Sequence, residues 1–286
     1  MAFNGWLVKK TIQKSMKRLG FDKPLVVNAF NPYLGSPLAN KLEESKLVYY
    51  CYDEISACNW TKKHGGKLEQ DFMLKVDAVI VSSEGLYHSK NQYNKNCYTI
   101  KNGVKMDFLQ SKIGLEIPQN EPMRLGYIGS IDSRIDYDLL IEIATQNPDK
   151  ELVMVGRVVF DKPTVAINIE RLSAFANVRF EGVKESTILA SYLSSFTVGL
   201  IPFVKNIQTS VIYPLKINEY LAAGLAVVST NFAPLSEFEE VVAFAEDTKS
   251  FCEKITEVIA EDSPEMKKKR HAFATQNTWP KRAKYG

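Results

Sequence analysis

The stretch Tyr213–Thr230, YPLKINEYLAAGLAVVST, contains the residues whose types and spacing best suit chemistry in this chain. Pro214 suits the first turn of a helix, where unpaired backbone N–H groups and the helix dipole favour an anion. Lys216 adds a positive charge in that turn, and Glu219 follows on the same helix face. A solvated ion pair between the two is the simpler interpretation, but it explains neither the proline nor the apolar residues that follow. The segment is therefore a candidate anion site.

Two further candidates follow apolar runs that read as strands. Gly129 and Ser130 end the run LGYIGS, and a glycine there lets the backbone approach a phosphate. Arg157 comes directly after VMVG, and its guanidinium could bind phosphate oxygens with two hydrogen bonds. An ordinary glycine turn and a surface arginine are the alternatives. The G-x-G-x-x-G spacing of dinucleotide-binding proteins is absent.

Other reaction classes find little support in the sequence. The four cysteines (Cys51, Cys58, Cys97 and Cys252) form no C-x-x-C pair and have no histidine at ligand spacing, so we expect reduced thiols and no metal or cofactor. The three histidines are scattered, and no hydrolase or metalloprotease motif occurs. The basic residues are not interleaved with aromatic residues as in nucleic-acid-binding proteins. No run is long enough to span a bilayer, so a cytoplasmic protein is expected.

The elements that must position these residues alternate along the chain. Short apolar runs alternate with segments of helical period, which is typical of βαβ units and a parallel sheet. Ten strands are predicted, four in the first half and six in the second, at 25–30, 47–52, 78–83, 97–102, 124–130, 151–156, 178–182, 197–202, 225–230 and 241–246. The helix YDLLIEIATQ between the first two strands of the second half should present Leu139, Leu140, Ile143 and Ala144 to the core.

The length of 286 residues fits two domains. The segment 114–122, GLEIPQNEP, contains two prolines and little periodicity, so it is the predicted linker. We expect two domains, one at 1–118 and one at 119–286. Both should be Rossmann-like, doubly wound α/β domains. The first has only four predicted strands and is expected to be incomplete.

The chain begins with a basic segment that reads as an amphipathic helix. Six Lys/Arg residues and one acidic residue, Asp22, lie within residues 6–23, although the whole chain carries a net charge of only +3. Val8, Ile12, Met16 and Leu19 would form its apolar stripe. A helix that covers the first domain is one interpretation. Contact of residues 6–19 with an anionic membrane surface, peripheral to the inner face of the membrane, is the other.

The pattern P-x-K-x-x-E-Y-L-A-A-G-x-x-V-V-S-T in the stretch from Pro214 resembles the donor-binding segment of bacterial glycosyltransferases with the GT-B fold, of the kind grouped in glycosyltransferase family 4. Further segments resemble the nucleotide-sugar domain of that family in the same order: LGYIGSIDSRIDYDLL, LVMVGRV, NVRFEGVKESTILASYLSSFTVGLIPF and TWPKRA. The segment VDAVIVSSEGLYHS, followed by YTIKNGV, resembles the end of its acceptor domain. The resemblance covers nearly the whole chain from about Leu25.

The resemblance implies a role for each matching residue. Glu219 lies where the family's glutamate binds the ribose hydroxyls of the nucleotide, and Pro214 opens that segment. Arg157 and Lys216 would neutralise the departing diphosphate without a metal. Gly129 and Ser130 would border the sugar diphosphate in a cleft between the domains, with the loop Gly182–Thr187 near the base.

On the acceptor side, the resemblance places a histidine or aspartate beside the donor sugar in the segment LVYYCYDE. Asp53 is the candidate there, Glu54 is second, and an acidic turn without a catalytic role is the alternative. The expected catalytic residues are therefore Asp53, Arg157 and Lys216.

The chain departs from the family pattern at two places. Val211 stands where many members have a second glutamate that binds the transferred sugar, which leaves open both the sugar and the retaining or inverting outcome. The family's first strands and their glycine-rich loop have no counterpart before Trp6.

The expected function is a hexosyltransferase-type glycosyltransferase that moves a sugar from a nucleotide diphosphate to a glycan or lipid-linked acceptor in polysaccharide assembly. A non-catalytic nucleotide-sugar-binding half that needs a partner chain is the alternative. A nucleotide-sugar epimerase is a third reading, for which no acid–base carboxylates can be located.

Overall fold

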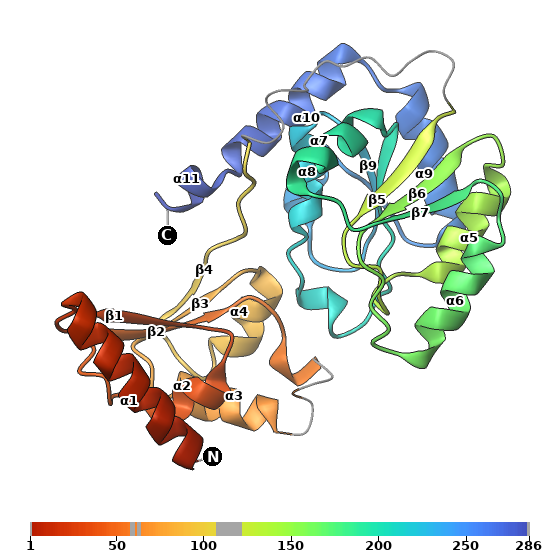
Figure 1. The fold of residues 1–286 in the computed structure, drawn as a ribbon. Coiled ribbons are helices and arrows are strands. Elements are labelled where there is room, and N and C mark those ends of the chain that lie inside the picture. The colour runs from red at the N-terminus through yellow and green to blue at the C-terminus, as the bar shows by residue number, and fades with distance from the viewer. Residues whose placement is uncertain (1, 58–60, 62–63, 107–121, 285–286) are drawn as a thin grey trace. The chain divides into compact units, whose positions relative to one another are not determined.

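A computed structural model describes residues 2–57, 61, 64–106 and 122–284 of the chain (Figure 1). The chain divides into two compact units, of which the first takes in Met1–Lys101 and Ser210–Tyr213, and the second Asn102–Thr209 and Pro214–Tyr285. The predicted boundary between residues 118 and 119, and the predicted linker up to residue 121, lie outside the described residues. The predicted domain limits, and the predicted incompleteness of the first domain, stay predictions.

The first unit is built on a parallel sheet in the order β1-β2-β3-β4. All four predicted strands are confirmed, as β1 (Leu25–Ala29), β2 (Lys46–Cys51), β3 (Ala78–Val81) and β4 (Cys97–Thr99). Its helices are α1 (Ala2–Leu19), α2 (Pro32–Leu38), the short 3₁₀ helix η1 (Ile55–Ala57), α3 (Gly65–Met73) and α4 (Glu84–Lys90). Tyr49 of β2 and Phe72 of α3 are fully buried and meet edge to face at the centre of the core.

The opening helix α1 covers its own unit with most of its apolar stripe. Val8 and Ile12 line a cavity of about 220 Å³ together with residues of β1 and α2, and Gly5 packs against Pro37. Leu19, however, is 66% exposed, so the prediction that it continues the stripe is wrong. It lies in the last turn of the helix, just before the chain turns at Gly20, which has a positive φ of +72°.

The second unit is built on a six-stranded parallel sheet in the order β10-β9-β8-β5-β6-β7. All six predicted strands are confirmed, as β5 (Arg124–Ile128), β6 (Glu151–Val155), β7 (Val178–Gly182), β8 (Val198–Ile201), β9 (Ala226–Thr230) and β10 (Ala243–Ala245). The inner strands read as continuous apolar runs because both of their faces are buried, as the fully buried VGLI of β8 shows.

Helices cover both faces of the six-stranded sheet, as the doubly wound prediction requires (Figure 1). One face carries α5 (Tyr137–Gln146), α6 (Pro163–Ser173) and α9 (Thr248–Ala260), and the other carries α7 (Ser186–Ser195), α8 (Leu215–Ala222) and α10 (Pro264–Gln276). The remaining short helices are η2 (Thr209–Val211), η3 (Ser236–Phe238) and α11 (Trp279–Arg282). The predicted core face of α5 is confirmed, since all four of its residues are buried. The fold class is therefore α/β with two Rossmann-like parallel sheets.

Candidate functional site

The candidate site lies at the carboxyl edge of the six-stranded sheet. Strand β5 lies between β6 and β8, so the chain runs outward to β6 on one side and to β8 on the other. Such a reversal of strand order leaves a crevice beyond the carboxyl ends of the two central strands, and ligands of open parallel sheets bind there. Gly129 follows β5, and α8 begins shortly after β8. The topology therefore brings together two segments that lie more than 80 residues apart.

Gly129 allows the side chain of Lys216 to lie directly on the end of β5. Its φ is +149°, and a Cβ atom there would come within 2.0 Å of Lys216 Cε and 2.7 Å of Lys216 Nζ. Gly156, which follows β6, packs directly against this turn. A Cβ at Gly156 would come within 1.9 Å of the Gly129 carbonyl oxygen. No side chain fits at either position without displacing its neighbour. The two glycines therefore leave room for the Lys216 side chain and let a ligand approach the backbone.

Lys216 is a half-buried cation held among aromatic rings. Its Nζ lies 5.7 Å from the ring centre of Tyr127 and 5.8 Å from that of Phe203. Burial lowers the pKa of Lys216 below its usual value, and the nearby Arg134 lowers it further, while Glu219 and Asp132 oppose this shift. The ammonium group is therefore held where an additional anion would stabilise it.

Glu219 lies on the same face of α8 and is also half-buried. Burial raises the pKa of its carboxyl group, and Lys216 offsets only part of that shift. Neither the Lys216 amine nor the Glu219 carboxylate forms an ion pair or hydrogen bond within the part of the chain that the structure describes. The simple ion pair considered from the sequence is therefore not formed. Both groups remain available to a ligand.

The amino end of α8 has the features of an anion-binding site. Pro214 is buried and precedes the helix as its N-cap, one position earlier than the first turn predicted for it. No side chain caps the helix, and Ile217 N–H donates to the Pro214 carbonyl oxygen at 3.1 Å. The N–H groups of Leu215 and Lys216 have no acceptor within the helix. Helix α8 thus presents its positive dipole end and a lysine together.

Arg157 and Ser130 follow the neighbouring strands β6 and β5. The backbone N–H of Ile131, next to Ser130, donates to the Arg157 carbonyl at 2.8 Å, and the Tyr127 hydroxyl donates to the Ser130 carbonyl at 2.8 Å. Arg157 is exposed, and its guanidinium has no ion pair or hydrogen bond to any described residue. The six predicted donor-side residues therefore gather along the ends of two adjacent strands and the start of α8.

Sequence reasoning missed a second cation in this site. Arg134 lies in the loop between β5 and α5, and it donates from Nε to Asp132 Oδ1 at 2.9 Å and from Nη2 to Oδ2 at 2.5 Å. Its guanidinium lies 5.8 Å from the Phe203 ring centre, on the ring that also lies near Lys216. The polar run Asp132-Ser133-Arg134 after a strand was the available signal. That signal does not show that Arg134 lies near Lys216, because their closeness depends on the pairing of β5 with β8.

The acceptor-side candidates lie in the first unit, at the carboxyl end of β2. Asp53 is half-buried, and its Oδ1 accepts a hydrogen bond from the Glu54 N–H at 2.8 Å. Glu54, the second choice, is buried, and both of its carboxylate oxygens accept from Lys90 Nζ at 2.9 Å. Because Glu54 is committed to this ion pair, Asp53 remains the better candidate for contact with a substrate.

Val211, which stands where the family pattern has a second glutamate, also belongs to the first unit. Its carbonyl accepts a hydrogen bond from Ser83 Oγ at 2.5 Å, and its side chain packs against the core of that unit. The predicted base loop, Gly182–Thr187, begins with a positive φ of +67° at Gly182. Val183 of this loop is 68% exposed, which leaves an apolar side chain available to a ligand.

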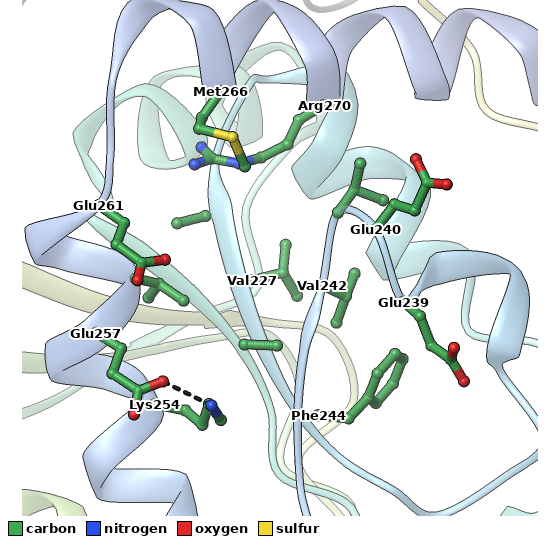
Figure 2. Close-up of a pocket in the computed structure, with 14 residues that line it drawn as sticks. Val227, Glu239, Glu240, Val242, Phe244, Lys254, Glu257, Glu261, Met266 and Arg270 are labelled. Atoms are coloured by element: carbon green, nitrogen blue, oxygen red, sulfur yellow. Dashed lines mark hydrogen bonds and ion pairs between the residues drawn. The ribbon is translucent and has the colours of Figure 1, made fainter.

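A cavity of about 410 Å³ lies elsewhere in the second unit, at the start of β9 and β10 (Figure 2). Its rim carries Glu239, Glu240, Glu257 and Glu261, and its floor includes the apolar side chains of Val227, Val242 and Phe244. Lys254 is paired with Glu257 at 2.6 Å, and Arg270 is bound to Asp262 at 2.6 Å. A rim of glutamates repels a diphosphate, and no predicted site residue lines this cavity. It is not the candidate anion site.

The described residues contain no cluster of three or more His, Cys, Asp or Glu side chains that could hold a metal ion. Cys51, Cys97 and Cys252 are buried free thiols, and Cys58 lies outside the described residues. His271 has a backbone partner, since its Nδ1 lies 2.8 Å from the Ala222 carbonyl oxygen. None of the helices in the described segments has the length and apolarity needed to cross a bilayer.

Known proteins resemble this chain in part of its sequence and in its fold. Residues 122–261 match the family described as "Glycosyl transferases group 1". The chain is 24% identical over 224 residues to the "Putative teichuronic acid biosynthesis glycosyltransferase TuaH" of Bacillus subtilis (strain 168), which covers 72% of this chain. It spans 56% of the length of that relative.

Two solved structures share the fold. The sucrose-phosphate synthase (tll1590) of Thermosynechococcus elongatus has a TM-score of 0.76 and 18% identity, with 97% of this chain and 75% of that chain covered. Anabaena Alr3699/HepE in complex with UDP and glucose has a TM-score of 0.74 and 15% identity, with 96% and 77% covered. Residues 122–261 therefore resemble the group 1 glycosyltransferases, and the fold of the chain is of the GT-B type.

Proposed function

We propose that this chain is a group 1 glycosyltransferase and that it transfers a hexosyl group from a nucleotide diphosphate sugar to a glycan or lipid-linked acceptor. The observation that carries the proposal is the arrangement of Lys216 and Glu219. A half-buried ammonium, which packs on Gly129 at the end of β5, and a half-buried carboxylate lie on α8, and neither is paired with a described residue. The diphosphate of a nucleoside diphosphate supplies an anion for the Lys216 ammonium, and its ribose supplies hydroxyl donors for the Glu219 carboxylate.

In the proposed site, the carboxylate binds the ribose of the donor, and the cations and backbone N–H groups bind its diphosphate. Glu219 accepts hydrogen bonds from the two ribose hydroxyls, which suits a carboxylate with several lone pairs. Lys216, Arg157 and the N–H groups at the start of α8, which Pro214 precedes, bind the diphosphate, and Gly129 and Ser130 let it approach the backbone. As the bond between the sugar and the diphosphate breaks, negative charge grows on the leaving oxygen. Fixed cations stabilise that charge, which is the reason for proposing a reaction without a metal.

Arg134 supports the same site from the β5–α5 loop. It is held by both oxygens of Asp132, so its orientation is fixed, and its positive charge lowers the pKa of Lys216. A diphosphate near both cations removes their mutual repulsion. Arg134 therefore contributes to the affinity for the diphosphate, and Asp53 is proposed as the acceptor-side group that faces the donor sugar.

The comparisons support a choice of donor and pathway. HepE was solved with UDP and glucose, which favours a UDP-sugar as the first donor to test. The relative TuaH is named for teichuronic acid biosynthesis, which favours an acceptor in cell-surface polysaccharide assembly at the cytoplasmic side of the membrane.

A donor panel tests the proposal. Purified protein is incubated with UDP- and GDP-sugars and a set of glycan and lipid-linked acceptors, and release of the nucleoside diphosphate is measured. Wild type should release nucleotide from at least one donor, and Lys216→Met and Asp53→Asn should reduce the rate by about 10²-fold or more. Release at equal rates by wild type and both variants would contradict the assignment.

A second candidate function is a nucleotide-sugar-binding chain that acts only with a partner. The observation that favours it is the edge strand β1, where Leu25 is 61% and Val27 is 53% exposed. An exposed apolar edge strand offers unpaired backbone groups to another chain. Sugar transfer by the purified monomer would exclude this candidate, whereas nucleotide binding without transfer would favour it.

We also propose a peripheral contact between residues 6–19 and an anionic membrane surface. Since Val8 and Ile12 face the protein, the contact must use the outer face of α1. Trp6 (50% exposed) and Leu7 (45% exposed) lie there with Lys10, whose Nζ is 4.1 Å from the Trp6 ring centre. A surface that combines lysines with an exposed tryptophan suits an anionic interface.

A further inference from the structure

Three charged side chains are buried together in the first unit, at the carboxyl end of β2. Lys90, the last residue of α4, donates from Nζ to Glu54 Oε1 and Oε2 at 2.9 Å and to Glu69 Oε2 at 2.7 Å. All three residues are less than 10% exposed. Two carboxylates and one ammonium give this cluster a net negative charge if all are ionised. The proposed reaction does not use any of the three directly.

Neutral donors from several elements complete the cluster. Glu69 Oε1 accepts from the Tyr49 hydroxyl at 2.8 Å and from the Cys51 thiol at 3.4 Å. Glu54 Oε1 accepts from the Ser56 hydroxyl at 2.7 Å. Strand β2, the loop after it, α3 and α4 are thus joined through two carboxylates. Fully satisfied buried polar networks of this kind fix one arrangement of the segments that they join.

The segment that the cluster fixes is the loop that carries Asp53. Cys51 precedes this residue and donates from its thiol to the Asp53 carbonyl at 3.2 Å. Glu54 follows it and donates its N–H to the Asp53 carboxylate at 2.8 Å. Glu54 therefore uses its backbone N–H on Asp53 and its carboxylate on Lys90, whereas the single thiol group of Cys51 lies within reach of both the Asp53 carbonyl and Glu69. Movement of Glu54 away from Lys90 would move the Asp53 carboxylate as well.

We propose that Glu54, Lys90 and Glu69 are positioning residues that hold the Asp53 carboxylate in its working orientation. The inference rests on the role proposed above for Asp53. Stability alone is a weak reason for this arrangement, because apolar side chains of similar volume often stabilise a core as well as a buried ion pair does. The cluster lies at the carboxyl end of a parallel strand, which is the edge where such sheets bind their ligands.

The test compares Glu54→Gln with Leu47→Ala in the full-length protein. Glu54→Gln keeps the shape of the side chain and removes the charge that faces Lys90. Leu47→Ala is the matched control. Leu47 is buried at the opposite end of the same strand, so its replacement by alanine lowers the stability of the unit without touching the cluster. Transfer kinetics, the Kd for the nucleoside diphosphate and amide hydrogen exchange of residues 52–57 are measured for each protein.

Glu54→Gln should lower kcat by about 10-fold to 10²-fold, as expected when a reacting group is misplaced, and leave the nucleotide Kd unchanged. Hydrogen exchange of residues 52–57 should accelerate while that of β3 does not. Leu47→Ala should leave kcat within about twofold at a temperature where it is folded. A kcat for Glu54→Gln equal to that of Leu47→Ala would overturn the proposal.

The exchange measurement also separates this inference from the function on which it rests. If wild type transfers no sugar from any donor, the proposed function fails, and hydrogen exchange still reports on the loop. Faster exchange confined to residues 52–57 in Glu54→Gln then supports the positioning role of the cluster. Unchanged exchange in that segment would overturn it, whatever the activity of the wild type.

Discussion

Lys216 and Glu219 are the residues whose electrostatics point most clearly to a ligand. Burial lowers the pKa of the lysine and raises that of the glutamate, so in both cases the protein disfavours the charged form. Glu54, which is paired with Lys90, shows the opposite shift, since its pKa lies below the usual value. Perturbed groups at the carboxyl edge of a parallel sheet are typical of a binding site.

One prediction concerns the stability of the ligand-free protein. A carboxyl group whose pKa is raised on folding destabilises the folded state once the pH exceeds its unfolded pKa. Glu219→Gln removes that cost at neutral pH, so the variant should have a Tm equal to or above that of wild type. Differential scanning calorimetry at pH 7 without nucleotide measures this, and a clearly lower Tm would show that Glu219 is a structural residue.

A second prediction concerns Gly129. Alanine there must adopt a φ of +149° and displace the Lys216 side chain, so nucleotide affinity should fall by about tenfold or more. Gly20→Ala is the matched control, because Gly20 also has a positive φ but has open space around it. Both variants should lose some stability through backbone strain, and only Gly129→Ala should lose nucleotide binding. Equal binding by the two variants would contradict the packing of Lys216 on Gly129.

At the scale of elements, the sequence predicted the strands well and the contacts between distant elements poorly. The inner strands of the second unit were predictable because buried parallel strands are continuous apolar runs bounded by polar turns. Leu19 was misplaced because helical periodicity does not show where a helix leaves its neighbour. Arg134 was missed because its closeness to Lys216 is set by the pairing of β5 with β8, which no local pattern encodes.

A third prediction concerns the elements joined by the Glu54–Lys90–Glu69 cluster. Burial opposes ionisation of Glu54, but the ammonium of Lys90 and the hydrogen bonds from Ser56 together outweigh it and hold the pKa of Glu54 below its usual value. Its stabilising contribution is therefore full above the unfolded pKa of about 4.3 and is lost as the pH falls through the folded pKa. Tyr49 and Cys51 face the same cluster and stay neutral over this range, because burial raises the pKa of each.

Thermal unfolding of wild type and Glu54→Gln between pH 7 and pH 3 measures this contribution. The difference in Tm between the two proteins should be largest near pH 7 and should shrink below about pH 4. A constant difference across the whole range would show that the ionised carboxylate of Glu54 does not stabilise the first unit.

At the scale of the whole molecule, the charge is distributed unevenly. Residues 6–23 carry six basic side chains, whereas the net charge of the chain is only +3. The remainder is therefore slightly acidic. An uneven distribution of this kind favours attraction of residues 6–23 to an anionic surface.

A fourth prediction follows for lipid vesicles. Wild type should bind vesicles that contain anionic phospholipid and should not bind neutral phosphatidylcholine vesicles. Because each basic residue near such a surface contributes about 1 kcal/mol, the double variant Lys10→Glu, Lys14→Glu should bind at least about tenfold more weakly. Lys249→Glu is the matched control, since Lys249 is an exposed lysine in the second unit. Sedimentation with the vesicles measures binding, and equal binding by all three proteins would contradict the membrane proposal.

Isothermal titration calorimetry of UDP and GDP with wild type, Lys216→Met and Glu219→Ala tests the central claim most directly. Wild type should bind at least one of the two nucleotides at one site per chain. Each variant should bind it at least about tenfold more weakly, since a lost hydrogen bond or ion pair to a charged group costs about 1.5–3 kcal/mol. No heat from either nucleotide, or the same Kd in wild type and both variants, would contradict the account.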